Sequence, residues 1–468
     1  MRKKDNIFIS TLSVISSIIL YFVTKEPYGS APKILACLSS AVVFFMIYEV
    51  VINKSLRTIY FLPYIVLSWL YFQSPFLLNE KTEYFLRTIK EEYISEISIY
   101  CFFSIILIFS GYTFFYNYSV KPLSSRESKF SNSQLRNLTI LFIIIGILYR
   151  IGEKFSPDLV AQLSNLIQIL FFAPSIVLAL YTLYLLRAKS KFKIDLYHLF
   201  VILFIAFEFL LRLSTTLMVQ VFILFFGGLL AYFSERKKLP MISIIIASLI
   251  LMPLYQARKY FRVVREVETF GSSELAIGSQ ILKQTLSSNS GFDNKLSDFS
   301  ETAYNKEHNR FENLSYISHV VLQHKRGSKS FLLGETFYWL PLVPIPRIIF
   351  PAKPVNDMST GMATNYGVRG EFSNASINFP MLIEGYINFG FNGMLIMAFI
   401  FGLSMKWFVM KFGAGIGDLN LIIIINSMKH FVHAEGNITL VFGALIQIYL
   451  FWWVLINVFK VGVTRERQ

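Results

Sequence analysis

Long apolar runs separated by short polar stretches make up most of the chain, up to about residue 256 and again from residue 391. A helix needs about 20 mainly apolar residues to cross a bilayer, and run after run approaches that length. The pattern predicts an all-α integral membrane protein. Its twelve expected spans are 6–24, 31–53, 58–79, 97–117, 137–154, 159–186, 194–213, 214–233, 239–256, 391–411, 418–434 and 438–459.

Composition supports a membrane protein. Only 16% of the residues are charged and 54% are hydrophobic, whereas soluble domains carry about a quarter charged residues. The N-terminal MRKKDN precedes an apolar run that is too long for a signal peptide, so we expect an uncleaved first span. Cys37 and Cys101 lie in apolar runs, which favours buried packing residues over a disulfide or a metal site.

The net charge of +15 has a topological explanation that does not involve nucleic acid. Basic residues mark the cytoplasmic ends of membrane spans. With the N-terminus in the cytoplasm, inside segments hold 21 of the 44 Lys and Arg residues, short outside segments hold 9, and the segment 257–377 holds 14. This distribution predicts that both termini are cytoplasmic and that the long segment lies outside.

The long segment between spans nine and ten is the main irregularity. Structureless loops of such length are rare unless they are functional. It mixes polar and amphipathic stretches, so we expect short helices that lie against the membrane surface. In an alternative arrangement, one part of the segment re-enters the membrane. The predicted organisation is a bundle over 1–256, an outer loop over 257–390 and a second bundle over 391–468.

Clustered cations make this outer loop a candidate anion site. Arg258, Arg262 and Arg265 share one helical face where span nine ends. Guanidinium groups bind phosphate oxygens in pairs, although lipid anchoring by long side chains would explain the same row. Arg347 and Lys353 lie in a proline-rich stretch that cannot form one helix. This stretch is either a rigid loop that binds an anion or a structural clamp.

Arg369 stands between Gly367 and Gly370, which allow close approach of the backbone. Glu384 lies in an apolar run just before span ten, as a candidate general base or as the partner of an arginine.

His430 and His433 are three residues apart near the outer end of span eleven. Such spacing suits zinc, but no second pair of ligands accompanies it. We therefore predict no metal site and expect the two histidines to line a polar cavity. Glu208 and Arg212, four residues apart in span seven, favour a structural ion pair, and Arg150 is a similar intramembrane cation.

Several catalytic motifs are absent from the sequence: it has no GxxxxGK[ST] phosphate loop and no DxD metal-nucleotide motif, and it has no GxSxG or CxxC. We therefore expect no cofactor and no reaction driven by cytoplasmic nucleotides.

Several features between Arg310 and Leu403 resemble the oligosaccharide repeat-unit polymerases, the O-antigen polymerase type of bacterial inner membranes. They are NRFENLSYISHVV, then LLGETFYWLPLVPIPRIIFPAKP, then SINFPMLIEGYINFGFNGMLIMAFIFGL. The resemblance covers about a fifth of the chain. It implies a membrane-embedded glycosyltransferase of the GT-C type, with one large periplasmic loop, that joins repeat units carried on undecaprenyl pyrophosphate.

The resemblance also implies roles for individual residues. Cations would stabilise the pyrophosphate leaving group without a metal, and aromatic rings such as Tyr338 and Tyr386 would stack on sugars. A chain-length regulator and a flippase are implied partners. The expected substrate-binding cations are Arg258, Arg262, Arg265, Arg310, Arg347, Lys353 and Arg369, and the candidate bases are Glu384, then His319, His430 and His433.

Two other functions fit the same topology. A ligase that moves the finished glycan onto lipid A core would have a similar number of spans and a large outer loop. A flippase or transporter for lipid-linked sugars would be expected to show two related halves, and the sequence shows none.

Overall fold

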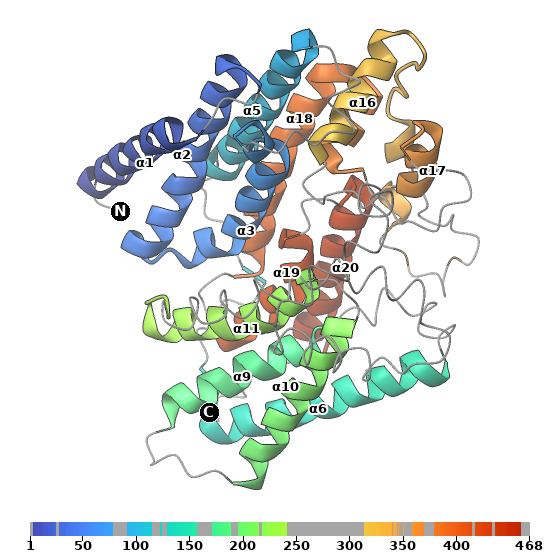
Figure 1. Cartoon of the computed structure of the whole chain (residues 1–468). Coiled ribbons are helices and arrows are strands. Elements are labelled where there is room, and N and C mark those ends of the chain that lie inside the picture. The colour runs from blue at the N-terminus through green and yellow to red at the C-terminus, as the bar shows by residue number, and fades with distance from the viewer. Residues whose placement is uncertain are drawn as a thin grey trace, which may run out of the picture. The chain divides into compact units, whose positions relative to one another are not determined.

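The chain is described by a computed structural model in which helices account for almost all regular structure (Figure 1). No strand occurs among the residues that the structure describes. These residues are 3–24, 28–77, 91–114, 122–123, 129–156, 171–188, 195–214, 218–240, 313–338, 340–343, 345, 350, 358–368, 379–413, 417–432 and 436–459.

The chain divides into two compact units. Unit 1 comprises Met1–Glu127 and Asn309–Gln468, and unit 2 comprises Ser128–His308. The helices of the predicted first bundle are therefore shared between the units, with those before residue 128 grouped with the C-terminal helices. The expected three-part division at 256 and 390 stays a prediction.

Unit 1 is built around two long helices, α5 (Glu91–Phe114) and α18 (Met381–Lys411), which share the most extensive contact in the described chain and lie side by side in Figure 1. Gly111 and Gly402 allow this approach, because a Cβ on either would collide with the backbone of the other helix. The other helices of unit 1 are α1 (Lys3–Val23), α2 (Ser30–Asn53), α3 (Leu56–Phe72), η1 (Ser74–Phe76), α16 (Asn313–Lys325), η2 (Glu335–Phe337), η3 (Leu340–Leu342), α17 (Met358–Asn365), α19 (Asp418–Val432) and α20 (Ile438–Asn457).

Unit 2 contains four described helices, α6 (Asn132–Phe155), α9 (Ala173–Arg187), α10 (Leu196–Ser214) and α11 (Met218–Arg236). Helix α9 packs against both α6 and α11. A capping box fixes the start of α6: Gln134 N–H donates to Ser131 Oγ (3.3 Å), and Ser131 N–H donates to Gln134 Oε1 (2.8 Å). The core of the unit is formed by Ile143, Val177, Tyr181, Tyr197, Val201 and Phe204.

Seven described helices are long and apolar enough to cross a membrane, so the prediction of an all-helical, multi-pass membrane protein is confirmed. They are Asn6–Val23, Ser30–Asn53, Tyr93–Phe114, Asn132–Phe155, Leu196–Leu213, Met381–Lys411 and Ile438–Asn457. Four more predicted spans coincide at least partly with α3, α9, α11 and α19. Most of the predicted span 239–256 lies outside the described residues, and the total of twelve stays a prediction. Cys37 and Cys101 are buried, as expected.

Helix α18 begins ten residues before the predicted span at 391. A kink at Phe389 and Gly390 separates its first two turns from the long remainder. Gly390 has a φ of 66°, which glycine adopts without strain. Short helices do occur within the predicted outer loop, namely α16, η2, η3 and α17. A membrane-surface position for them stays a prediction.

Candidate functional site

Buried polar groups gather at one end of unit 1, where α18 is broken. The kink removes the usual helical donors for two carbonyl groups. Leu332 N–H donates instead to the Ile387 carbonyl, and Leu333 N–H donates to the Asn388 carbonyl, both at 3.1 Å. The segment 331–338 is thereby fixed against the start of α18.

Asn388 ties this segment to α18 a second time. Its Oδ1 accepts a hydrogen bond from Gly334 N–H (2.9 Å), and its Nδ2 donates to Thr336 Oγ1 (2.7 Å) and to the Glu384 carbonyl (2.8 Å). Asn388, Thr336 and Glu384 are all buried. Three of the four hydrogen-bonding positions of the amide are therefore used, and the side chain is held in one orientation.

Glu384 faces the N-terminus of α20. Its Oε2 accepts a hydrogen bond from Ile438 N–H (2.8 Å), the first residue of that helix. The start of α18 is joined to the same place, because Met381 N–H donates to the Gly436 carbonyl (3.1 Å). A carboxylate is stabilised at a helix N-terminus by the unpaired N–H groups and by the helix dipole. Glu384 thus links α18 and α20, whether or not it also accepts a proton in catalysis.

His430 lies on the last turn of α19, and the short connection to α20 brings it to the same end of unit 1 as Glu384. Its side chain is buried. Asn426, one turn earlier on α19, is also buried, and neither of its amide atoms is hydrogen-bonded within the described part of the chain. Such a group is unusual in a packed interior. His433 lies outside the described residues.

Two histidines of α16 meet the end of α17. His319 Nε2 donates to the Tyr366 carbonyl (2.6 Å), since a carbonyl only accepts. Its remaining lone pair is therefore on Nδ1, and this is the atom that could take a proton. His324 Nε2 is hydrogen-bonded to the Tyr366 hydroxyl (2.8 Å).

Burial shifts the pKa values of both His324 and its hydrogen-bond partner Tyr366. It lowers the pKa of His324 and raises the pKa of Tyr366 to about 12. The pair is accordingly an uncharged imidazole next to an uncharged phenol at neutral pH. The imidazole also stacks on Phe331, with ring centroids 4.5 Å apart.

Aromatic rings continue this cluster towards α5. Tyr386 is buried, and its ring lies 5.8 Å from that of His324 and 6.0 Å from that of Tyr100. The carboxylate of Glu96 accepts hydrogen bonds from both Tyr100 and Lys325, which joins α5 to α16. Tyr386 therefore faces protein, whereas Tyr338, which is 74% exposed, could offer a ring face to a sugar.

The cations of the predicted anion site belong to segments that the structure does not describe. Arg258, Arg262, Arg265, Arg310, Arg347, Lys353 and Arg369 all lie outside the described residues. Their convergence on a pyrophosphate stays a prediction. In the part of the chain that is described, no group of three or more His, Cys, Asp or Glu side chains could hold a metal ion.

The candidate site contains residues that the sequence did not single out. Asn388, Thr336, His324 and Tyr366 are polar residues in apolar or aromatic surroundings, without a recognisable motif. One signal was available, because Asn388 follows Glu384 by four residues and so shares its helical face.

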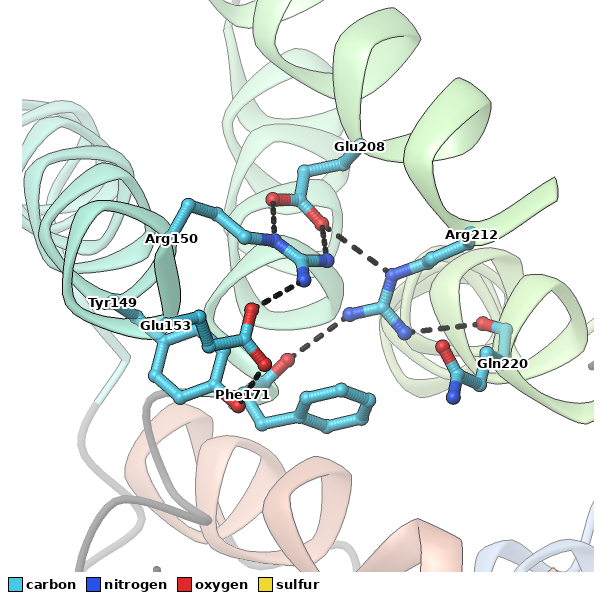
Figure 2. A network of polar contacts seen from close by, with 7 residues as sticks. All are labelled: Tyr149, Arg150, Glu153, Phe171, Glu208, Arg212 and Gln220. Carbon is cyan, nitrogen blue, oxygen red and sulfur yellow. Dashed lines mark hydrogen bonds and ion pairs between the residues drawn. The ribbon is translucent and has the colours of Figure 1, made fainter. Parts of the chain in front are cut away.

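Unit 2 holds a separate network of buried charges (Figure 2). Glu208 and Arg212 form the predicted ion pair (3.5 Å). Arg150 of α6 donates to both oxygens of Glu208, from Nε (3.0 Å) and from Nη2 (2.9 Å), and pairs through Nη1 with Glu153 (2.7 Å). Arg212 also donates to the Phe171 carbonyl (3.0 Å) and the Gln220 carbonyl (3.2 Å).

This network joins the ends of all four described helices of unit 2. Ionisable groups within membrane spans are costly to bury and are retained where they pair or function. Here the two arginines share one buried carboxylate, so the network contributes at least to the packing of the unit.

Comparison with known proteins gives no relative: no protein-family model, no curated protein and no solved structure matches this chain.

Proposed function

We propose that the chain polymerises oligosaccharide repeat units carried on undecaprenyl pyrophosphate, for O-antigen or a similar surface polysaccharide. It would act as a membrane-embedded glycosyltransferase of the bacterial inner membrane, with the long segment 257–390 in the periplasm. The observation that best supports this is the gathering of Glu384, Asn388, His319 and His324 at one end of unit 1. The segments that bear Arg347, Lys353 and Arg369 directly adjoin this end in the sequence.

The proposed reaction has a simple balance. A hydroxyl oxygen of the acceptor sugar attacks the anomeric carbon of the donor sugar, and the bond from that carbon to the pyrophosphate oxygen breaks. Undecaprenyl pyrophosphate leaves with the bonding electron pair, and the hydroxyl proton passes to a protein base. Cations preorganised around the leaving group would stabilise its developing charge.

The candidate bases differ in availability. Glu384 accepts hydrogen bonds from Ile438 N–H, at Oε2, and from the Thr336 side chain, and its other lone pairs are left for a proton. His319 offers Nδ1, because its Nε2 is occupied by a carbonyl. His430 is buried beside a polar residue of its own helix, Asn426.

A broken membrane helix is also a feature of transporters, in which freed carbonyls bind ions or substrate. In α18 the Ile387 and Asn388 carbonyls are already occupied by the N–H groups of residues 332 and 333. This occupation favours an anchoring role for the kink and makes a flippase the weaker candidate.

A gel of surface polysaccharide from the native bacterium tests the proposal. The gene is deleted and then restored as wild type, as Arg347→Ala, or as Arg326→Ala, an exposed arginine of the same segment. We expect deletion to reduce the ladder to core plus one repeat unit. Wild type and Arg326→Ala should restore the ladder, and Arg347→Ala should not, at equal protein levels in the membrane.

Loss of the single-repeat band on deletion would contradict polymerisation. A ligase or a flippase would then be the better assignment, because both act on the delivery of even one repeat unit.

A further inference from the structure

An open groove runs between α6 and α10 of unit 2. It encloses about 450 Å³, within the range of ligand sites in proteins. Its walls are almost entirely apolar, and Arg150, Lys154 and Glu208 border it. The apolar walls are formed mainly by Ile147, Ile151, Phe200, Leu203, Phe204 and Phe207.

The groove is open at the surface of unit 2. Leu203 in its wall is 58% exposed, and Ile151 and Phe200 are about half exposed. Both helices are candidate membrane spans, so we expect hydrocarbon to be the medium against them. A hollow of this size left empty would forfeit the dispersion contacts of its walls, and the hydrocarbon chain of a lipid is the occupant that fits its chemistry.

The bordering charges select the head group. Lys154 lies one turn after Arg150 on the last turn of α6, so both cations face the same side of the helix. No carboxylate of the described residues lies within ion-pairing distance of Lys154. Of the three charged residues that border the groove, Arg150 and Lys154 are positive and Glu208 is negative, so the border carries a net positive charge.

We propose that this groove binds one acyl chain of an anionic phospholipid, with the phosphate held by Lys154 and by Nη1 of Arg150. Glu153, which now pairs with that nitrogen at 2.7 Å, is partly exposed and gives way to the phosphate. Arg150 keeps its two bonds to Glu208. The site is independent of the proposed glycosyl transfer, because it is formed only by residues of unit 2, whereas the candidate catalytic residues belong to unit 1.

Native mass spectrometry of the full-length protein, released from detergent, tests the site. The probes are phosphatidylglycerol, phosphatidylethanolamine and undecaprenyl phosphate, each titrated separately. Leu203→Trp fills the groove. Leu199→Trp is its matched control, because Leu199 lies one turn away on α10, is 48% exposed and does not line the groove.

Wild type and Leu199→Trp should retain one phosphatidylglycerol, and Leu203→Trp should lose it. Lys154→Gln should weaken binding about fivefold, as expected for one partly exposed ion pair. Glu153→Gln should tighten binding, because a competing carboxylate is removed. Lys154 is exposed and Glu153 is partly exposed, so these two variants keep the test informative if Leu203→Trp does not fold.

Three results would overturn the proposal. Equal retention of phosphatidylglycerol by Leu203→Trp and wild type would show that the groove is not the site. Equal binding of phosphatidylethanolamine, with no effect of Lys154→Gln, would show that charge plays no part. Retention of undecaprenyl phosphate alone would reassign the groove to a polyprenyl lipid.

Discussion

Removal of the Glu208 carboxylate should destabilise unit 2 more than removal of any exposed carboxylate. Glu208 is 1% exposed and is paired with Arg150 and with the fully buried Arg212. In Glu208→Ala, Arg150 keeps Glu153, whereas Arg212 loses the buried carboxylate with which it is paired and keeps its bonds to the Phe171 and Gln220 carbonyls. Removal of one partner from a buried ion pair costs about 3–5 kcal/mol.

Glu235→Ala is the matched control. Glu235 also holds two cations, Arg187 at 2.7 Å and Lys129 at 3.2 Å, yet it is 20% exposed and Lys129 is 67% exposed. Solvent screening reduces the expected cost to about 1 kcal/mol. A double variant, Glu208→Ala with Arg212→Met, removes the buried guanidinium as well and should recover part of the lost stability.

The measurement is the thermal unfolding midpoint in detergent, at one scan rate because membrane proteins often unfold irreversibly. At about 2–4 °C per kcal/mol for a unit of this size, Glu208→Ala should lower the midpoint by roughly 10 °C. The Glu235→Ala midpoint should fall by about a quarter of that. Equal midpoints for Glu208→Ala and Glu235→Ala would refute the view that the carboxylate neutralises a buried charge.

Three further predictions concern unit 1. Burial lowers the pKa of His324, so the unfolded chain binds a proton at this residue more readily than the folded chain does. Stability should therefore fall as the pH drops below about 6.5. Melting curves should show this fall for wild type and a smaller fall for His324→Gln. Gly402→Ala should cost about 1–3 kcal/mol through its clash with α5, measured as a lower melting midpoint, whereas Gly361→Ala, with open space around it, should be close to neutral. Asn388→Ala leaves the Gly334 N–H without its partner and should cost about 1–3 kcal/mol; limited proteolysis should then cut the segment 331–338 faster than in wild type, and an unchanged rate would contradict its anchoring role.

Hydrophobic runs were enough to predict the seven membrane-length helices of the described residues, because a span must be apolar over its whole length. The start of α18 was missed for a physical reason. Its first two turns contain Glu384 and Asn388 and end at a glycine kink, so the longer apolar run begins only after the kink. Their polar side chains are stable there only because the segment 331–338 and the start of α20 supply partners.

Contacts between residues far apart in the sequence could not be predicted in the same way. The ion pair of Glu208 with Arg212 could be predicted, since four residues separate them on one helix. The bonds of Glu208 to Arg150, 58 residues away, depend on how α6 packs against α10. Helix packing of this kind follows from side-chain shapes across an interface, which periodicity does not encode.

Polymerase activity can be assayed with the purified protein in vesicles, supplied with a single repeat unit on undecaprenyl pyrophosphate and no nucleotide. We expect lipid-linked products of two and more repeat units, formed without an added divalent cation and greatly reduced by Arg347→Ala. If the single unit stays unextended, and is transferred only to an added lipid A core acceptor or merely moved across the bilayer, polymerase function is contradicted.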